Sequence, residues 1–348
     1  MKNILVKIKK ANLSGRGGGS FPTATKWEMV KKAPGKRKFV ICNGSEGEPG
    51  IKKDYFILEN HAGHMVDGMK IAIEYLKAEK GIIYLNPEYY KKFRRRLTQL
   101  CHGAPIEVFC KPHSAGYIGG EETAAVNCIE GIKCEPRLRP PFPTTSGLYD
   151  CPTLINNIET FYDVSLIAEG KYENKRYYTI NGDCLWTGVY YLPEDWTIEK
   201  ILKETKNYPD FEFFVQVGGD ASGEVLNDKQ LILPVGGGGS ITVYSLTKHD
   251  LMGLMRRWAN FFAHESCGQC TPCREGTTRL KEILYSKNRD WKLIFSILNN
   301  LSTASFCGLG CAVPIPFESF IRNVLSKYPE MNIQMPEGER KMICECFL

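Results

Sequence analysis

The sequence predicts three structural parts in a chain of 348 residues: an N-terminal α/β domain, a small strand-rich domain and a C-terminal helical bundle. Apolar strand-like runs alternate with a helical pattern between residues 38 and 124. Short strand-like runs follow between 174 and 246, and helical periodicity takes over at Lys248. We place the three domains at residues 1–168, 174–246 and 247–330, with a C-terminal tail at 331–348.

The first domain has the pattern of a parallel sheet. Residues 38–42 and 81–85 are short apolar runs typical of buried strands, and residues 65–76 between them carry apolar side chains at helical spacing. A further strand is expected at 106–109, and a helix opens after the glycines of 117–124. Strand, helix and strand in succession predict a βαβ unit.

The other two parts have different periods. Residues 175–181, 187–192, 211–217 and 240–243 read as strands, with a short helix at 197–206. From Lys248 onward, Leu251, Leu254, Trp258 and Phe262 share one helical face, and residues 291–301 and 317–325 continue the helical pattern. The third part is therefore expected to be a small helical bundle.

The charge balance and the N-terminus exclude some classes of function. A net charge of +6 is mild and spread along the chain, so we expect no nucleic-acid partner. The basic run at 91–96 fits a solvated helix face better than a patch for a phosphate or an acidic partner. The first residues lack the apolar core of a signal peptide, and no run approaches the roughly 18 apolar residues of a membrane helix. A cytoplasmic protein without a transmembrane segment is expected.

A cysteine cluster is the strongest local signal. Cys267, Cys270 and Cys273 follow the C-x2-C-x2-C spacing that lets three thiolates converge on a [4Fe–4S] cluster. The fourth ligand must come from elsewhere, and Cys307 and Cys311 lie about one helical hairpin downstream. Zinc remains the main alternative, although four-cysteine zinc sites usually use two separate C-x2-C pairs. A third alternative is that these cysteines are inert thiols that bind no metal.

The remaining cysteines and one arginine have weaker implications. We expect the scattered cysteines to fill cores: Cys42, Cys101, Cys110, Cys128, Cys134, Cys151 and Cys184. Cys344 and Cys346 fit a frayed tail better than a metal site. Arg274 follows Cys273 directly and would offset the negative charge of a cluster, unless it only pairs with Glu265 or Glu275.

Three glycine-bearing loops are candidates for contact with a ligand. Four glycines occupy five positions between Gly15 and Gly19, which favours close backbone approach to a phosphate, although a flexible linker is also possible on local grounds. The loop at 43–50 follows a predicted strand, and ligands of open α/β sheets bind beyond the carboxyl ends of strands. The two acids at Glu121 and Glu122 either face a ligand or only complement a helix dipole.

Together these segments resemble one family. It is the FMN-binding, NADH-oxidising subunit of respiratory complex I and of related NAD-linked hydrogenases and formate dehydrogenases. The resemblance rests on six motifs in family order: GRGGGSFPTATKW (15–27), CNGSEGEPG (42–50), AGYIGGEETA (115–124), PRLRPPFPTTSG (136–147), PTLINNIET (152–160) and HESCGQCTPCREGT (264–277).

The resemblance implies roles for individual residues. The FMN-binding positions are Gly15, Arg16, Gly17, Gly18, Gly19, Lys26, Asn43, Tyr117, Gly120, Glu121, Glu122, Asn156, Asn157 and Thr160. The positions near the nicotinamide nucleotide are Phe21, Glu46, Glu48, Arg139 and Phe142. Glu46 and Glu121 are the candidate catalytic residues, in the sense that they tune and orient the cofactors. Cys267, Cys270, Cys273 and Cys307 match the cluster ligands, with Cys311 standing where the family usually has Asp.

Several departures from the family pattern fall on the nucleotide side. Gly19 and Ser20 replace Ala and Gly, Ser45 replaces an acid, Met29 replaces an aromatic residue, and Arg139 replaces Lys. The implied function is the transfer of a hydride from NAD(P)H to FMN and then of single electrons to a [4Fe–4S] cluster, or the reverse. The alternative is an electron-relay module that no longer binds NADH and takes electrons from a protein donor.

The resemblance also implies a small ubiquitin-like (β-grasp) second domain and a setting in a larger complex. The expected partners are a small thioredoxin-like [2Fe–2S] subunit and a larger iron–sulfur subunit. Through these partners, a cytoplasmic chain would lie peripheral to a membrane.

Overall fold

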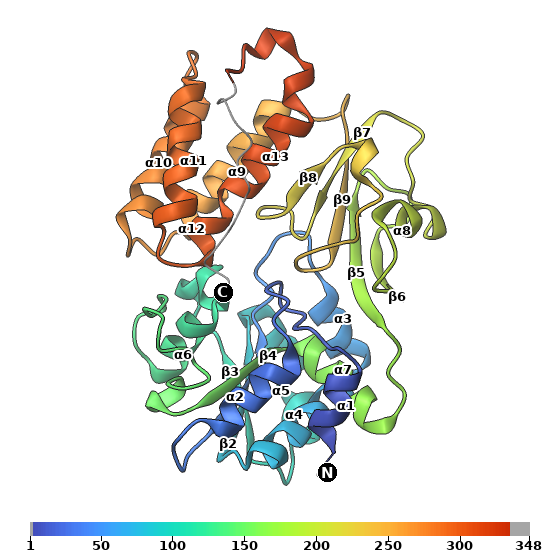
Figure 1. The fold of residues 1–348 in the computed structure, drawn as a ribbon, viewed down its shortest axis with the longest axis vertical. Coiled ribbons are helices and arrows are strands. Elements are labelled where there is room, and N and C mark those ends of the chain that lie inside the picture. The colour runs from blue at the N-terminus through green and yellow to red at the C-terminus, as the bar shows by residue number, and fades with distance from the viewer. Residues whose placement is uncertain (1–2, 335–348) are drawn as a thin grey trace. The chain divides into compact units, whose positions relative to one another are not determined.

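The computed structural model describes residues 3–334, which form two compact units (Figure 1). The first unit contains the residues up to Gly47, Ile51–Tyr178 and Val189–Glu194. The second contains Glu48–Gly50, Thr179–Gly188 and the residues from Asp195 onward. Most of the tail predicted at 331–348, including Cys344 and Cys346, lies outside the described residues.

The first unit is built on a parallel four-stranded sheet. The strand order is β3 (Ile106–Cys110), β2 (Lys80–Leu85), β1 (Phe39–Gly44) and β4 (Thr153–Asn157). The three strands expected from apolar runs are confirmed, and β4 is an addition. Alternate residues of the central strand enter two separate cores, with Val40 in one and Ile41 in the other. Burial on both faces explains why β1 reads as a continuous apolar run.

Helices surround this sheet. They are α1 (Ile4–Lys10), α2 (Thr23–Lys32), α3 (Lys53–Asn60), α4 (Ala62–Leu76), α5 (Pro87–Leu100), α6 (Glu122–Glu130) and α7 (Ile158–Glu169). The helix expected at 65–76 is confirmed as α4. It packs so closely on α7 that a Cβ at Gly68 would lie 2.7 Å from the carbonyl carbon of Phe161. The basic run at 91–96 lies on α5, where Lys92 pairs with Glu59 of α3.

A mixed five-stranded sheet follows along the chain. Its order is β6 (Gly188–Pro193), β5 (Lys175–Gly182), β9 (Ser240–Ser245), β7 (Phe213–Val217) and β8 (Glu224–Leu226). β5 and β9 run parallel, whereas β7 is antiparallel to both β8 and β9. The four strands and the short helix α8 (Ile198–Glu204) expected from the sequence are present, and β8 was not predicted.

The C-terminal part is helical, as expected. It contains α9 (Leu251–Glu265), α10 (Thr271–Tyr285), α11 (Trp291–Ala304), α12 (Gly308–Ala312) and α13 (Pro314–Asn323). Trp258 of α9 is fully buried and meets the rings of Phe317 and Phe320 edge-on. The Ser319 hydroxyl of α13 accepts a hydrogen bond of 2.9 Å from the amide of Val225 in β8. The C-terminal helices thus share one compact unit with β7, β8 and β9, and the three-domain division stays a prediction.

No helix within residues 3–334 is long and apolar enough to cross a membrane.

Candidate functional site

The candidate FMN residues gather at the carboxyl ends of two neighbouring strands. Asn43 lies near the end of β1, and Asn156 and Asn157 end β4, which pairs with it. The Asn43 amide donates to the carbonyl of Gly120 at 2.8 Å, and the Asn157 amide donates to the carbonyl of Asn43 at 3.4 Å. Motifs far apart in the sequence therefore meet at the sheet edge where open α/β folds bind ligands.

The glycine loop forms a closed turn beside this edge. Its two ends are joined by a bridge between Ser14 and Pro22, and the amide of Gly15 donates to the carbonyl of Phe21 at 2.9 Å. A Cβ placed on Gly17 would touch Cβ of Asn157 at 3.4 Å. At Gly18, whose φ is +107°, and at Gly19 a Cβ would meet nothing within 4 Å. The loop is therefore closed toward Asn157 and open on its outer side.

Arg16 anchors the loop from inside the protein. Its side chain is 1 % exposed, and Nε donates to Asp163 at 3.1 Å while the terminal nitrogens bond to Glu194 and Tyr172. Burial lowers the pKa of Arg16, but the carboxylates of Asp163 and Glu194 outweigh it and raise that pKa. The backbone amide of Arg16 donates to the Thr160 hydroxyl at 3.0 Å. The guanidinium of Arg16, expected to contact FMN, is therefore buried inside the protein. Arg16 contributes only its backbone to the glycine loop.

The helices α2 and α6 bring the remaining candidates together. Lys26 on α2 forms an ion pair with Glu122 at the start of α6. The Glu121 carboxylate caps α6 by accepting from the amides of Thr123 and Ala124, each at 2.9 Å. The helix-capping alternative for Glu121 therefore describes its contacts in this structure. On the sheet side, the indole of Trp27 donates to the Asn156 amide oxygen at 3.0 Å.

Glu46 occupies an unusual environment. Its φ of +27° lies in a region that non-glycine residues rarely adopt, a feature that tends to occur at functional sites. The carboxylate accepts from the amides of Asp54 at 2.7 Å and Tyr55 at 3.0 Å, and from the Tyr89 hydroxyl at 2.5 Å. Burial and the neighbouring Asp54 raise the pKa of Glu46 to about 7. This acid therefore changes protonation near neutral pH.

A buried ionic cluster under the site was not predicted from the sequence. Lys53 is 2 % exposed and forms ion pairs with Asp54 at 2.7 Å and Glu159 at 3.2 Å. Its ammonium also donates to the Asn157 amide oxygen at 2.8 Å, and the Asn157 nitrogen donates to Asp54 at 2.6 Å. Burial lowers the pKa of Lys53, but the surrounding carboxylates raise it overall. The cluster fixes which way the Asn157 amide points.

The nucleotide candidates divide between the two units. In the first unit, Phe21 and Phe142 keep 42 % and 40 % of their surface exposed, as a ring that stacks on a ligand requires. Arg139 lies 3.9 Å from Glu121. Glu48 belongs to the second unit, where its carboxylate accepts from the amides of Ala221 at 3.0 Å and Ser222 at 2.9 Å. These bonds give Glu48 a structural role within that unit.

The cluster cysteines lie in a turn and the first turn of a helix. Gly268, with φ +77°, lets the chain turn after Cys267, while Cys270 is the N-cap of α10 and Cys273 lies in its first turn. A helix N-terminus favours negative charge. Arg274 donates to the carbonyl of Gly268 at 2.8 Å and also pairs with Glu275 at 2.9 Å. The arginine therefore ties this turn to α10.

Cys307 precedes α12, close to Cys273. A Cβ on Gly310 of α12 would touch Cβ of Cys273 at 3.3 Å, so α12 packs directly against that cysteine. None of Cys267, Cys270, Cys273 and Cys307 is in a disulfide, and burial raises the pKa of Cys273 to about 11. Cys311 takes part in a disulfide.

Observations on residues 3–334 fit the two cofactors. The hydroxyl oxygen of Thr23, directly after the glycine loop, is buried without a hydrogen-bond partner among the described residues, as is that of Ser305 beside Cys307. The same residues contain no group of three His, Cys, Asp or Glu side chains placed to hold a single ion. The open glycine loop fits a phosphate-bearing flavin, and the four cysteines, none of them in a disulfide, fit a cluster.

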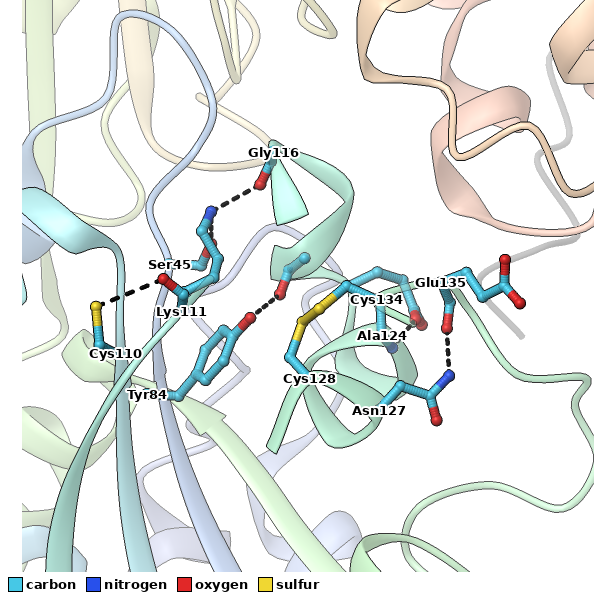
Figure 2. Close-up of a disulfide and its surroundings, with 12 residues drawn as sticks. Ser45, Tyr84, Cys110, Lys111, Gly116, Ala124, Asn127, Cys128, Cys134 and Glu135 are labelled. Carbon is cyan, nitrogen blue, oxygen red and sulfur yellow. Dashed lines mark hydrogen bonds between the residues drawn. A yellow bond between two sulfur atoms is a disulfide. The ribbon is translucent and has the colours of Figure 1, made fainter. Parts of the chain in front are cut away.

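The scattered cysteines fill cores only in part. Cys42, Cys101 and Cys128 are buried as expected, whereas Cys110, Cys151 and Cys184 are half-buried. Cys128 also forms a disulfide with Cys134 that was not expected and that ties the end of α6 to the segment after it (Figure 2). Beside the disulfide, the side-chain amide of Asn127 on α6 donates to the carbonyl of Glu135 at 2.6 Å. The sequence signal was the short spacing of the pair across Gly131, which ends α6 with a φ of +76°.

Two family models match this chain. Residues 8–166 match the Nuo51 FMN-binding domain, and residues 253–330 match the NADH-ubiquinone oxidoreductase-F iron–sulfur binding region. The first match covers the sheet, the glycine loop and the buried cluster. The second covers all four candidate cluster cysteines.

Whole-chain relatives agree with these models. The F-type subunit of NADH-quinone oxidoreductase from Aquifex aeolicus is 32% identical over 94% of this chain and 85% of its own length. The corresponding protein of Salmonella typhimurium is 33% identical over 98% of this chain and 86% of its own length. A chain of an NAD+-reducing [NiFe]-hydrogenase, solved in the H2-reduced state, superposes with a TM-score of 0.86 at 30% identity. That match covers 96% of this chain and 63% of the hydrogenase chain.

The parallel-sheet unit with its glycine loop, the four cysteines and these whole-length similarities place the chain in the family of F-type NADH-quinone oxidoreductase subunits, flavoproteins with an FMN-binding domain and a 4Fe–4S region that oxidise NADH within a multi-subunit complex.

Proposed function

We propose that this chain is an electron-entry subunit whose glycine loop and strand ends hold FMN and whose Cys267, Cys270, Cys273 and Cys307 hold a [4Fe–4S] cluster. The observation that carries the FMN site is the convergence of four separate motifs at one sheet edge. The Asn43–Gly120 hydrogen bond, the Lys26–Glu122 ion pair and the Arg16–Thr160 hydrogen bond link them. FMN accepts a hydride as an electron pair and releases electrons singly, which a cluster requires.

The side chains of the site have distinct roles in this proposal. The amides of the open glycine loop and the N-terminus of α2 face the phosphate, with Lys26 supplying charge. Asn157, held by Lys53 and Asp54, presents a fixed amide to the flavin. Glu46 and Glu121 orient and tune the cofactors. Phe21, Arg139 and Phe142 contact the nicotinamide nucleotide, whereas Glu48 holds the segment 219–222 within the second unit.

A matched pair of glycine variants tests the FMN site. Gly18 and Gly103 both have a positive φ, and a Cβ at either would meet nothing within 4 Å, so Gly18→Ala and Gly103→Ala carry similar backbone strain of about 1 kcal/mol. Only Gly18 lies in the glycine loop. Acid extraction should release less FMN from Gly18→Ala than from the wild type, and a full complement from Gly103→Ala. Equal FMN in both variants would contradict the assignment of the loop.

The choice of Cys307 over Cys311 is tested by two serine variants. Anaerobically purified Cys307→Ser is expected to lose the electron paramagnetic resonance signal of a reduced [4Fe–4S] cluster, because the cluster then has three thiolate ligands. Cys311→Ser should keep that signal. The reverse pattern would make Cys311 the fourth ligand.

Finer assignments follow from the same proposal. The mixed sheet with α8 is proposed to be a ubiquitin-like (β-grasp) domain at 174–246, between an FMN domain at 1–168 and a cluster domain at 247–330. The parallel pairing of β5 with β9 supports this. The proposed partners are a small thioredoxin-like [2Fe–2S] subunit and a larger iron–sulfur subunit, which would hold a cytoplasmic chain at the periphery of a membrane. Co-purification of a tagged chain from its native cells, with and without detergent, tests both points.

A further inference from the structure

A buried lysine lies directly under the turn that carries the proposed flavin contacts. Lys111 follows the last residue of β3, and its side chain is only 5 % exposed. The ammonium donates to the Ser45 hydroxyl at 2.9 Å and to the carbonyl of Gly116 at 2.7 Å (Figure 2). A buried ammonium loses several kcal/mol of hydration, so its position is held by these specific contacts.

The glycines around Lys111 show how tightly it packs beneath that turn. A Cβ on Gly119 would approach Cδ of Lys111 to 3.1 Å, so glycine at this position leaves room for the lysine stem. A Cβ on Gly120 would lie 3.1 Å from the Ser45 hydroxyl, which accepts the lysine's hydrogen bond. Lys111 therefore contacts Ser45 directly and packs against the turn at 117–120.

We propose that Lys111 is the residue that sets the reduction potential of the flavin, by placing a buried positive charge beneath the turn formed by Tyr117, Gly119 and Gly120. This inference rests on the proposed FMN site. Reduction adds negative charge to a flavin, and a positive charge in a low-dielectric surrounding stabilises the reduced form more than the oxidised form. Lys111 acts on the cofactor through its field and through the position of the turn.

The test is a spectroscopic redox titration of the bound flavin in the full chain. Lys111→Met removes the charge and keeps much of the stem, and Lys111→Arg keeps the charge. Ser45→Asp pairs the ammonium with a carboxylate, and Ser45→Ala removes the hydroxyl without adding charge. Lys111→Met and Ser45→Asp should lower the ratio of reduced to oxidised flavin at a fixed potential at least about tenfold, or about 30 mV for a two-electron couple. Lys111→Arg and Ser45→Ala should stay within about threefold, or about 14 mV.

The outcomes separate this inference from the proposed function. A wild-type chain that binds no FMN, even after reconstitution, would overturn both. A wild-type chain with FMN, together with an unchanged potential in Lys111→Met and Ser45→Asp, would overturn the role of Lys111 alone. If Lys111→Met loses FMN, the comparison of Ser45→Asp with Ser45→Ala decides, because both keep the lysine. Equal potentials in that pair would then overturn the inference.

Discussion

Glu46 couples the protein's stability to pH at the level of a single carboxyl group. Its pKa is about 4.5 in an unfolded chain and about 7 in the folded protein, because burial and the charge of Asp54 disfavour the ionised form. The folded state therefore binds the proton more tightly than the unfolded state. The stabilisation from protonation is complete below the unfolded pKa and is lost as pH rises through the folded pKa.

Denaturant unfolding measured from about pH 5 to about pH 8 tests this coupling. The wild type should lose stability as pH rises through this window. Glu46→Gln, which cannot ionise, should show a shallower decline. Asp163, whose pKa burial raises to about 8, contributes to the slope of both proteins, so the difference between the two profiles reports Glu46. If the stability of the wild type and that of Glu46→Gln changed with pH in parallel, the raised pKa of Glu46 would be contradicted.

Individual residues also show how far sequence reasoning could reach. The cysteine spacing and the glycine loop are local patterns, so both could be recognised before the fold was known. The inward turn of Arg16 depends on Asp163 and Glu194, which are remote in sequence. Lys53 and Asp54 stand in a charged run that resembles a solvated helix start, and only tertiary packing makes them buried. No local pattern distinguishes such a pair from an exposed one.

Helices α4 and α7 pack closely against each other in the first unit. Gly68 of α4 faces the backbone of α7 at Phe161, where a Cβ would overlap the carbonyl oxygen. Gly68→Ala should therefore destabilise the protein by about 3 kcal/mol. Gly63→Ala on the same helix meets nothing within 4 Å and should be neutral or stabilise by about 0.5 kcal/mol. The two midpoints of urea unfolding check this contrast, and equal midpoints would mean that the α4–α7 contact is looser than described.

The disulfide after α6 stabilises a segment that reaches the nucleotide candidates. Cys128 and Cys134 close a short loop, and the chain from there leads through Arg137, bonded to Glu130 of α6, to Arg139. Closing so short a loop contributes about 2 kcal/mol in the chain-entropy account. A dithiol reductant should lower the unfolding midpoint of the wild type by more than that of a Cys128→Ser/Cys134→Ser double variant, in which the disulfide of Cys311 remains. Cys151→Ser, which removes a free thiol, should respond like the wild type.

At the scale of elements, long apolar runs were predicted well and short ones were missed. β1 and β2 are mostly apolar and β9 is buried throughout, and each was expected at its place. β4 ends in two asparagines and β8 has three residues, so neither has a clear period. Both become strands because a neighbouring strand offers its backbone for pairing.

For the whole molecule, the class of fold follows from the order of patterns along the chain. A parallel sheet, a small strand-rich part and a helical bundle were expected in that order, and the structure has all three. The division into compact units could not be predicted in the same way. Contacts such as that between Val225 and Ser319 join the mixed sheet to the helices, and the segment Glu48–Gly50 leaves its sequence neighbours to join the second unit.

Electron entry through this chain is tested most directly by rapid freezing of the anaerobic protein after mixing with NADH, followed by electron paramagnetic resonance and flavin absorbance on the same samples. We expect the flavin absorbance to bleach and the signal of a reduced [4Fe–4S] cluster then to grow at a rate no faster than the bleaching. A cluster that stays oxidised while the flavin is reduced, or a flavin that millimolar NADH leaves oxidised, would contradict electron entry through this chain.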